Sequence, residues 1–292
     1  MKLATIRTAG HTRAARVEGD ALVELDHADV GAVLRGGPGA LADAATTTGH
    51  EHPVAAADFA PLVTEPGKVI CLGLNYADHI REMGHELPAF PTLFSKYTDA
   101  LIGARDSIVL PRVSECTDWE VELAFVIGTT VRHASNADAE AAIAGFTVAN
   151  DVSVRDWQNR TLQWLQGKTF EHTTPVGPWL TTTDEVGGPR PDLEVRCEVD
   201  GVVRQHSRTA QLVFDPPAIV AYASQFATLR PGDLVLTGTP AGVGFAMTPP
   251  VYLQAGQVVR TAIEGLGELL NRCVPEMCVT EIGAPEAGVV ED

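Results

Sequence analysis

Short apolar segments separated by glycine and proline turns dominate the chain beyond about residue 68. Five of them have the length and spacing of strands: "SIVLP", "VELAFVIG", "GFTVAND", "LEVRCEVDG" and "DLVLTGTP". Stretches with helical periodicity are fewer: "AEAAIAG", "SVRDWQNRTLQWLQ" and "PPAIVAYASQFA". This balance predicts an α+β domain (mixed α/β) dominated by strands, and not a regular βαβ alternation.

The first 65 residues have a different pattern. "KLATIRT" and "TRAARVEGDALVELD" alternate in the strand manner, with Gly19-Asp20 as the turn in the second stretch. One or two helices are expected between about residues 28 and 60, before Pro61, Pro66 and Gly67 interrupt the chain. We therefore predict a small N-terminal domain over residues 1–65 and a larger domain over residues 66–280. The acidic tail, residues 281–292, is expected to be poorly ordered.

Composition narrows the possible partners. The chain has 292 residues, enough for a substantial core, and a formal net charge of −17. Such a charge argues against nucleic acid or an anionic membrane as partner. No leader-like or membrane-spanning apolar run is present, so a cytoplasmic protein is expected. The five cysteines lack the paired spacing of a zinc site and are interpreted as reduced thiols.

The stretch "TDWEVELAF" places two glutamates, Glu120 and Glu122, on one face of a predicted buried strand. Two adjacent buried carboxylates are costly unless a cation lies between them. The alternative is a strand whose first residues emerge into solvent. A third carboxylate, Asp151, follows the next apolar strand and favours the cation. Three oxygen ligands without histidine or cysteine indicate a hard ion, Mg²⁺ or Mn²⁺.

A histidine and a glutamate, His79 and Glu82, are three residues apart in "GLNYADHIREMG", where Asp78 could cap a short helix. A carboxylate beside an imidazole raises its basicity, as a general base for water requires. An exposed His/Glu pair on a polar turn is the alternative.

Two lysines and a glycine-rich loop complete the candidate chemistry. Lys96 and Lys168 each follow an apolar or helical segment, and a lysine near three carboxylates could receive an anionic substrate or a developing oxyanion. The loop "LTGTPAGVG", residues 236–244, lacks the ending of a nucleotide-binding P-loop. Its N–H groups, including that of Gly238, and the hydroxyls of Thr237 and Thr239 could bind a small carboxylate.

Five motifs in this order resemble the fumarylacetoacetate hydrolase family: "ICLGLNYADH", "DWEVELAFVIG", "ANDVSVRDWQ", "GKTFEHTTPVGP" and "DLVLTGTPAGVG". The likeness extends from about residue 68 to residue 260. It implies a β-roll or β-sandwich domain with flanking helices, a small N-terminal α/β domain, a homodimer and one Mg²⁺ or Mn²⁺ per subunit.

The resemblance also implies roles for individual residues. Glu120, Glu122 and Asp151 look like the metal ligands, and Lys168 looks like the lysine that contacts the substrate oxo group. His79 and Glu82 look like a dyad that activates water, and two further positions, Gln158 and Thr239, match residues that touch a bound keto acid. Family members often have Lys-Pro where this chain has Lys96-Tyr97, so Lys96 is left out of the catalytic set.

Three functions are compatible with these features. The leading hypothesis is metal-dependent hydrolysis of a C–C bond in a 2,4-dioxo acid of the acylpyruvate or fumarylpyruvate type. The second is decarboxylation or isomerisation of oxaloacetate or of a ring-cleavage product. The third is a metal-dependent protein that binds keto acids without turnover.

Overall fold

The computed structural model of the protein describes residues 1–82 and 86–277. The expected acidic tail at 281–292 lies outside the described residues. So does Cys278. The other four cysteines are free thiols.

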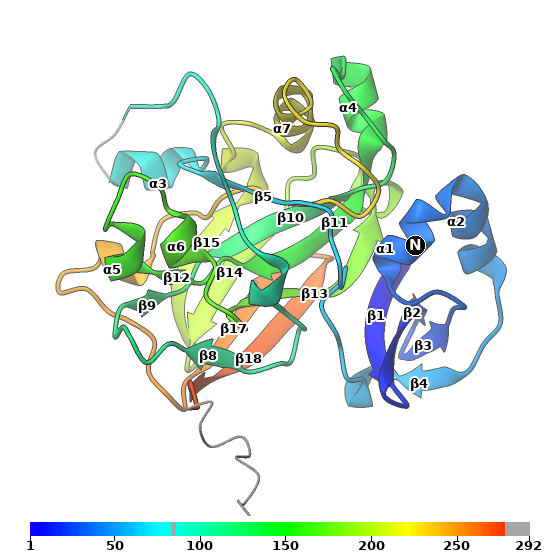
Figure 1. Ribbon diagram of the computed structural model, residues 1–292, viewed down its shortest axis with the longest axis horizontal. Coiled ribbons are helices and arrows are strands. Elements are labelled where there is room, and N and C mark those ends of the chain that lie inside the picture. Colours follow the sequence, from blue (N-terminus) through cyan, green and yellow to red (C-terminus); the bar gives the residue numbers. More distant parts are fainter. Residues whose placement is uncertain (83–85, 278–292) are drawn as a thin grey trace, which may run out of the picture.

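A large mixed sheet of eleven strands forms the centre of the fold (Figure 1). In spatial order its main path runs β4 (Glu51–Pro53), β3 (Ala21–Glu24), β2 (His11–Glu18), β1 (Lys2–Thr8), β13 (Thr174–Thr182), β11 (Ile143–Asn150), β10 (Val121–Ile127), β16 (Leu234–Leu236), β5 (Val69–Gly73) and β6 (Thr92–Ser95). The short strand β7 (Leu101–Ile102) pairs with β13 in parallel. Most neighbours are antiparallel, whereas β5 and β16 are parallel.

A second sheet packs against one face of the first. It contains β15 (Val202–Arg208), β14 (Glu194–Val199), β17 (Val258–Ile263), β18 (Gly267–Pro275) and β8 (Ile108–Leu110). A two-stranded ribbon, β9 (Thr117–Asp118) with β12 (Ser153–Val154), lies beside them. The structure therefore confirms the sheet-dominated mixed α/β class, with two layers of strands.

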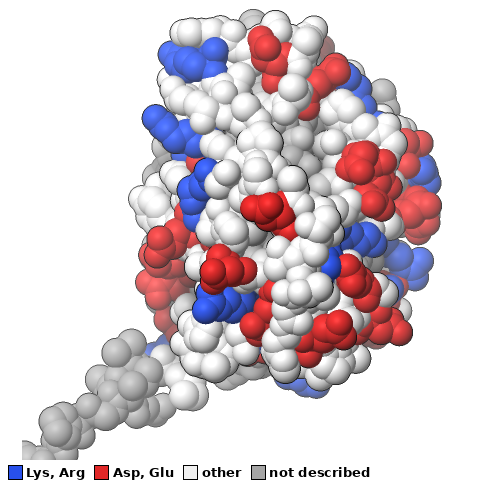
Figure 2. All heavy atoms as spheres, turned by 90° about the vertical axis from the view of Figure 1, so that its right-hand side faces the viewer, with Lys and Arg blue, Asp and Glu red and all other residues white. Residues whose placement is uncertain are grey.

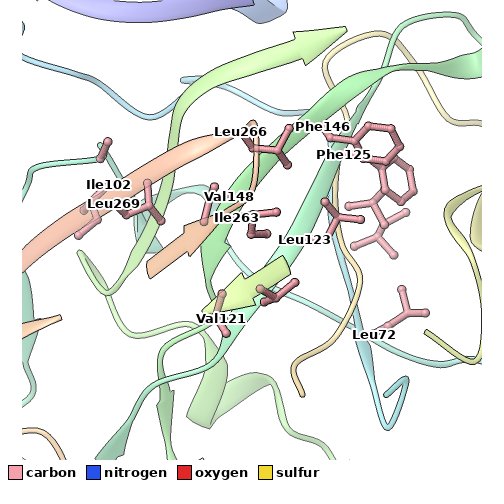
Figure 3. Packing of buried hydrophobic residues seen from close by; sticks show 14 of the residues in the cluster. Leu72, Ile102, Val121, Leu123, Phe125, Phe146, Val148, Ile263, Leu266 and Leu269 are labelled. Carbon is pink, nitrogen blue, oxygen red and sulfur yellow. The ribbon is translucent and has the colours of Figure 1, made fainter. Parts of the chain in front are cut away.

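The hydrophobic core between the two sheets follows the alternation of β10 (Figure 3). Val121, Leu123 and Phe125 belong to the cluster that includes side chains of β14, β17 and β18. Phe125 and Phe146 are directly opposite in the β10–β11 ladder, and their ring centroids are 6.3 Å apart. Ala124 and Val126, which alternate with them, belong to the cluster on the other face. The period of two expected for this strand is thus confirmed.

Helices cover the edges of this arrangement (Figure 1). They are α1 (Val30–Arg35), α2 (Gly37–Thr46), α3 (Ala77–Glu82), α4 (Asn136–Ala142), α5 (Arg155–Gln158), α6 (Leu165–Lys168) and α7 (Pro216–Ala223). The helical pattern predicted from residue 153 to 166 forms two short helices, α5 and α6. Asn159 follows α5 as its C-cap, and Leu162 in the connection is fully exposed.

The N-terminal unit contains the expected hairpin, with Gly19 and Asp20 between β2 and β3, and the two expected helices. Its strand β1 pairs with β13 of the larger domain, with Lys2 opposite Thr181. The sheet therefore continues from one unit into the other, and the domain boundary near residue 65 stays a prediction.

Figure 2 views the molecule from the side of the N-terminal unit and shows acidic and basic side chains interspersed on this face. Within residues 1–82 and 86–277, no helix has the length and apolar character needed to cross a bilayer.

Candidate metal centre and pocket

Three buried carboxylates converge where β10 begins and β11 ends. Asp151 follows β11 and donates its N–H to the carbonyl of Glu120 at 2.8 Å, while Glu122 is the second residue of β10. One carboxylate oxygen from each of the three lies within 4.8 Å of the others. Glu120 precedes the strand instead of belonging to it, but the residue is only 6% exposed. The alternative, a strand whose first residues emerge into solvent, is thus wrong, and both glutamates are buried as expected.

Glu122 shows that this cluster suits a cation. Its Oε2 accepts a hydrogen bond from the N–H of Gly238 at 2.7 Å, whereas the buried Oε1 has no hydrogen-bond partner. Burial, followed by the charges of Asp151 and Glu120, raises the pKa of Glu122 well above its usual value. An oxygen-only donor set with an unsatisfied buried oxygen fits a hard divalent ion.

Two buried lysines form ion pairs with the carboxylates and offset part of their negative charge. Lys168, at the end of α6, places Nζ 2.7 Å from Glu120 Oε2 and 2.8 Å from Asp151 Oδ2. Lys96, which follows β6, places Nζ 2.6 Å from Asp151 Oδ1 and is also buried. Lys96, which the sequence motif leaves out of the catalytic set, thus contacts the predicted ligand Asp151, so Tyr97 in place of proline does not keep the lysine away from the cluster.

Lys168 stays a cation in this environment. Burial alone would lower the pKa of its ammonium, but the charges of Asp151 and Glu120 outweigh burial, and the pKa is raised above the usual lysine value. Lys168 can therefore donate hydrogen bonds and stabilise negative charge near neutral pH.

A buried arginine was missed by sequence reasoning. Arg155 opens α5 and places Nη1 2.7 Å from Glu120 Oε1 and 2.9 Å from Gln158 Oε1. Its Nε and Nη2 lie 2.8 Å from Oδ2 of Asp118. The only signal in the sequence is that Arg155 and Gln158 are three residues apart, so both can lie on one helix face.

The glycine-rich loop is bound to β10 through the groups expected to hold a carboxylate. Thr237 Oγ1 and Thr239 Oγ1 donate to the carbonyls of Leu123 and Val121, each at 2.9 Å. Gln205 of β15, also missed, donates to Thr239 Oγ1 at 2.8 Å. The N–H of Gly238 also donates to Glu122. The loop therefore acts mainly by positioning the carboxylate cluster.

A cavity of about 220 Å³ opens beside the cluster. Its polar wall contains Glu120, Arg155, Gln158, Lys168 and Thr239. Its apolar lining includes Leu72, Leu74, Trp164, Val243 and Phe245. The cavity therefore brings together the predicted lysine and both predicted keto-acid contacts, at a size suited to a small substrate.

The predicted dyad cannot be placed in the same way. The backbone of α3 forms the expected short helix, but the side chains of His79 and Glu82 lie outside the described residues. Asp78 is the second residue of α3 and not its cap, and its Oδ2 accepts a hydrogen bond from Ser207 at 3.0 Å.

Comparisons with known proteins agree with this geometry. Residues 68–274 match the family model described as fumarylacetoacetate (FAA) hydrolase C-terminal. The chain is 49% identical over 217 residues to the mitochondrial oxaloacetate tautomerase Fahd2a of Rattus norvegicus, covering 74% of this chain and 69% of the relative. The human relative, oxaloacetate tautomerase FAHD2A, is 48% identical over 218 residues, with the same coverage of both chains.

Two solved structures share the fold. The 5-carboxymethyl-2-hydroxymuconate delta-isomerase of Mycobacterium smegmatis is 34% identical, with a TM-score of 0.78 over 95% of this chain and 100% of that chain. The maleylpyruvate hydrolase of Sphingobium sp. SYK-6 is 31% identical, with a TM-score of 0.77 over 94% and 100%. These relatives are named as enzymes, and those from rat and human are named as mitochondrial, so a cytoplasmic location stays a prediction. The family match over residues 68–274, together with the identity to these relatives, shows that the chain belongs to the fumarylacetoacetate hydrolase family.

Proposed function

We propose that this protein is a divalent-metal-dependent enzyme that interconverts the keto and enol forms of oxaloacetate or a similarly small 2-oxo diacid. The observation that carries the proposal is the small cavity in which Lys168 and Arg155 adjoin the carboxylate cluster. The 49% identity to an oxaloacetate tautomerase supports this isomerase reading over the hydrolase hypothesis derived from the sequence.

The reaction moves protons and breaks no bond between heavy atoms. A proton leaves C3 of the substrate, negative charge develops on the 2-oxo oxygen, and that oxygen takes up a proton. A Mg²⁺ or Mn²⁺ ion held by Glu120, Glu122 and Asp151 would act as a Lewis acid toward the carboxylate and 2-oxo oxygens.

The chain's own residues supply the remaining stabilisation. The ammonium of Lys168 stays charged and can donate a hydrogen bond to the oxygen on which charge develops. Arg155 and Gln158 lie on the same wall, where the positive charge of the guanidinium and the amide of Gln158 can hold the second carboxylate of a diacid. The base that removes the C3 proton stays assigned to His79 as a prediction.

The test is an assay of oxaloacetate enolisation, followed by ultraviolet absorbance, with the metal-stripped protein and with Mg²⁺ or Mn²⁺ added. We expect metal-dependent acceleration of keto–enol exchange, with release of pyruvate slower than exchange. Exchange at the uncatalysed rate in the presence of either metal would contradict the proposal.

Hydrolysis of a dioxo acid is the second candidate, and the structural similarity to a maleylpyruvate hydrolase favours keeping it. Hydrolysis needs an activated water in addition to enolate stabilisation, so His79→Ala should lower acetylpyruvate cleavage by about 10²-fold or more. Cleavage of acetylpyruvate without acceleration of oxaloacetate exchange would favour this candidate.

We also propose that the protein is a homodimer. Phe90, Tyr222 and Phe226 form an exposed aromatic row, with ring centroids 6.4 Å and 6.2 Å apart along it. Phe226 borders a groove along β5 and β6. Sedimentation velocity should show a dimer that Phe226→Glu weakens, and a monomer at all concentrations would contradict this proposal.

A further inference from the structure

Asp118, a fully buried carboxylate at the end of β9, lies outside the three-carboxylate cluster but accepts four hydrogen bonds from N–H donors. Oδ1 accepts from the backbone N–H groups of Trp119 and Gly244, each at 2.8 Å. Oδ2 accepts from the N–H of Phe245 at 3.0 Å and from Nε of Arg155 at 2.8 Å, and it forms an ion pair with Nη2 of Arg155, also at 2.8 Å. A buried carboxylate requires such partners, but their identity is informative.

Two of these partners form part of the cavity wall. Arg155 and Phe245 both line the cavity, and the guanidinium of Arg155 lies 5.8 Å from the centre of the Phe245 ring. Because Nε of Arg155 donates to Asp118 and Nη2 faces the same carboxylate, the remaining nitrogen, Nη1, points to Glu120 and Gln158. One carboxylate thus determines where the arginine presents its donors.

The turn that carries Phe245 has little freedom of its own. A Cβ on Gly244 would lie 1.9 Å from the carbonyl oxygen of Val251 and 2.9 Å from Oδ1 of Asp118. Trp119 Nε1 donates to the carbonyl of Gly242 at 3.1 Å, immediately before the turn. The turn therefore packs against Asp118 closely enough that a change in the carboxylate shifts the wall.

We propose that Asp118 is a positioning residue that holds Arg155 and the 243–246 turn together as one wall of the anion-binding cavity. A buried carboxylate needs partners for structural reasons alone, but two of the partners of Asp118, Arg155 and Phe245, also line the cavity. These contacts connect Asp118 to the groups that face the substrate. The inference deepens the proposed function and rests on it for the nature of the ligand, a small planar anion.

Asp118→Asn tests the proposal, because the amide keeps the size of the side chain but turns a donor toward some of the four N–H donors. The probe is oxalate with Mg²⁺, measured by titration calorimetry. We expect the dissociation constant of oxalate to rise about 10- to 100-fold, the range for losing one partner of a charged hydrogen bond. Amide hydrogen exchange of the 243–246 turn should become faster.

Asp233→Asn is the matched control. Asp233 is also buried and paired, with Lys68 Nζ at 3.0 Å and the N–H of Arg230 at 2.9 Å, but it does not line the cavity. This variant should lose thermal stability and keep the oxalate dissociation constant within about twofold. If Asp118→Asn loses stability in the same way and still binds oxalate like the unsubstituted protein, the proposal is overturned.

Arg155→Lys covers the case in which Asp118→Asn does not fold. A lysine keeps the charge, but its single ammonium cannot contact Asp118 and Glu120 with the fork geometry of arginine. It should weaken oxalate binding to a similar extent, and unchanged binding would overturn the proposal. In the double variant with Asp118→Asn and Arg155→Lys, the two increases in the oxalate dissociation constant should not multiply, because both substitutions disrupt the same contact between Asp118 and Arg155.

These readouts separate the inference from the proposed function. Hydrogen exchange in the turn needs no ligand, and oxalate binding needs no turnover. If the unsubstituted protein does not accelerate keto–enol exchange of oxaloacetate, only the proposed function is contradicted. If amide hydrogen exchange in the 243–246 turn is unchanged in Asp118→Asn, only the positioning role is overturned.

Discussion

Glu122→Gln is the substitution with the sharpest expected consequences. The side chain is completely buried, its Oε2 accepts from Gly238, and its Oε1 has no hydrogen-bond partner. Glutamine keeps the volume and one acceptor for Gly238, but it removes the charge. We expect the variant to fold, to lose its affinity for Mg²⁺, and to be at least as stable as the unsubstituted protein when both lack metal.

The pKa of Glu122 determines the pH dependence of this difference. Because that pKa is raised, first by burial and then by Asp151 and Glu120, the native state keeps a proton that the unfolded chain has lost. The contribution of this carboxyl to stability is therefore complete below the usual glutamate pKa of about 4.3 and is lost as pH rises through the raised value. Without metal, Glu122→Gln should therefore become more stable relative to the unsubstituted protein as pH rises through that interval.

The magnitude of the metal effect follows from mass action. At Mg²⁺ 100-fold above the dissociation constant, binding stabilises the native state by about 2.7 kcal/mol. For a chain of 292 residues, an unfolding entropy of about 0.6 kcal/mol/K near 60 °C converts this to roughly 4 °C in Tm. If the substitution weakens binding about 100-fold, the same Mg²⁺ concentration adds about 0.4 kcal/mol, which is less than about 1 °C.

Differential scanning fluorimetry at several pH values, with EDTA or with Mg²⁺, measures both effects. The matched control is Glu198→Gln, which changes a glutamate that is paired with Arg196 on the second sheet, away from the carboxylate cluster. An equal Mg²⁺-dependent rise in Tm for Glu122→Gln and the unsubstituted protein would refute the assignment of Glu122 as a ligand.

Three further predictions concern the cluster and the sheet. Lys168→Gln should lower turnover by about 10²- to 10³-fold at saturating Mg²⁺. It should also lower the Tm in EDTA more than in Mg²⁺, because two buried carboxylates lose the lysine cation that neutralises them. Equal losses of Tm under both conditions would argue against this neutralising role. Oxalate should inhibit competitively and raise the Tm only with Mg²⁺ present, whereas equal stabilisation in EDTA would place the anion elsewhere. Gly145→Ala should reduce the free energy of unfolding in urea by roughly 1 to 3 kcal/mol, since its Cβ would lie 2.3 Å from the carbonyl oxygen of Thr181. Gly39→Ala in α2, with no atom within 4 Å, should be neutral or stabilising.

Local patterns in the sequence predicted much of the centre of the fold. The period of two in β10 correctly separated Val121 and Leu123 from Glu122, because adjacent residues in a strand face opposite sides of a sheet. Asp151 could be placed beside them because it follows the next apolar strand. The ordered motifs then identified the family, which residues 68–274 match.

Partners that are distant in sequence could not be predicted in this way. Asp118 and Arg155 are 37 residues apart, and Lys96 lies 55 residues before Asp151. Nothing in the local pattern distinguishes these charges from solvated ones, since only the tertiary fold buries them. The leading reaction also rested on the dyad of His79 and Glu82, whereas the identity to an oxaloacetate tautomerase supports the alternative better.

The pairing of β1 with β13 has a consequence for synthesis on the ribosome. Lys2 is opposite Thr181, so β1 cannot join β13 until synthesis has passed residue 181. At translation rates of about 5–20 residues per second, this wait lasts roughly 10 to 35 seconds. During that time the hairpin of β1 and β2 presents an open edge, which makes the nascent N-terminal segment the place where chaperone binding or mispairing between neighbouring chains should concentrate.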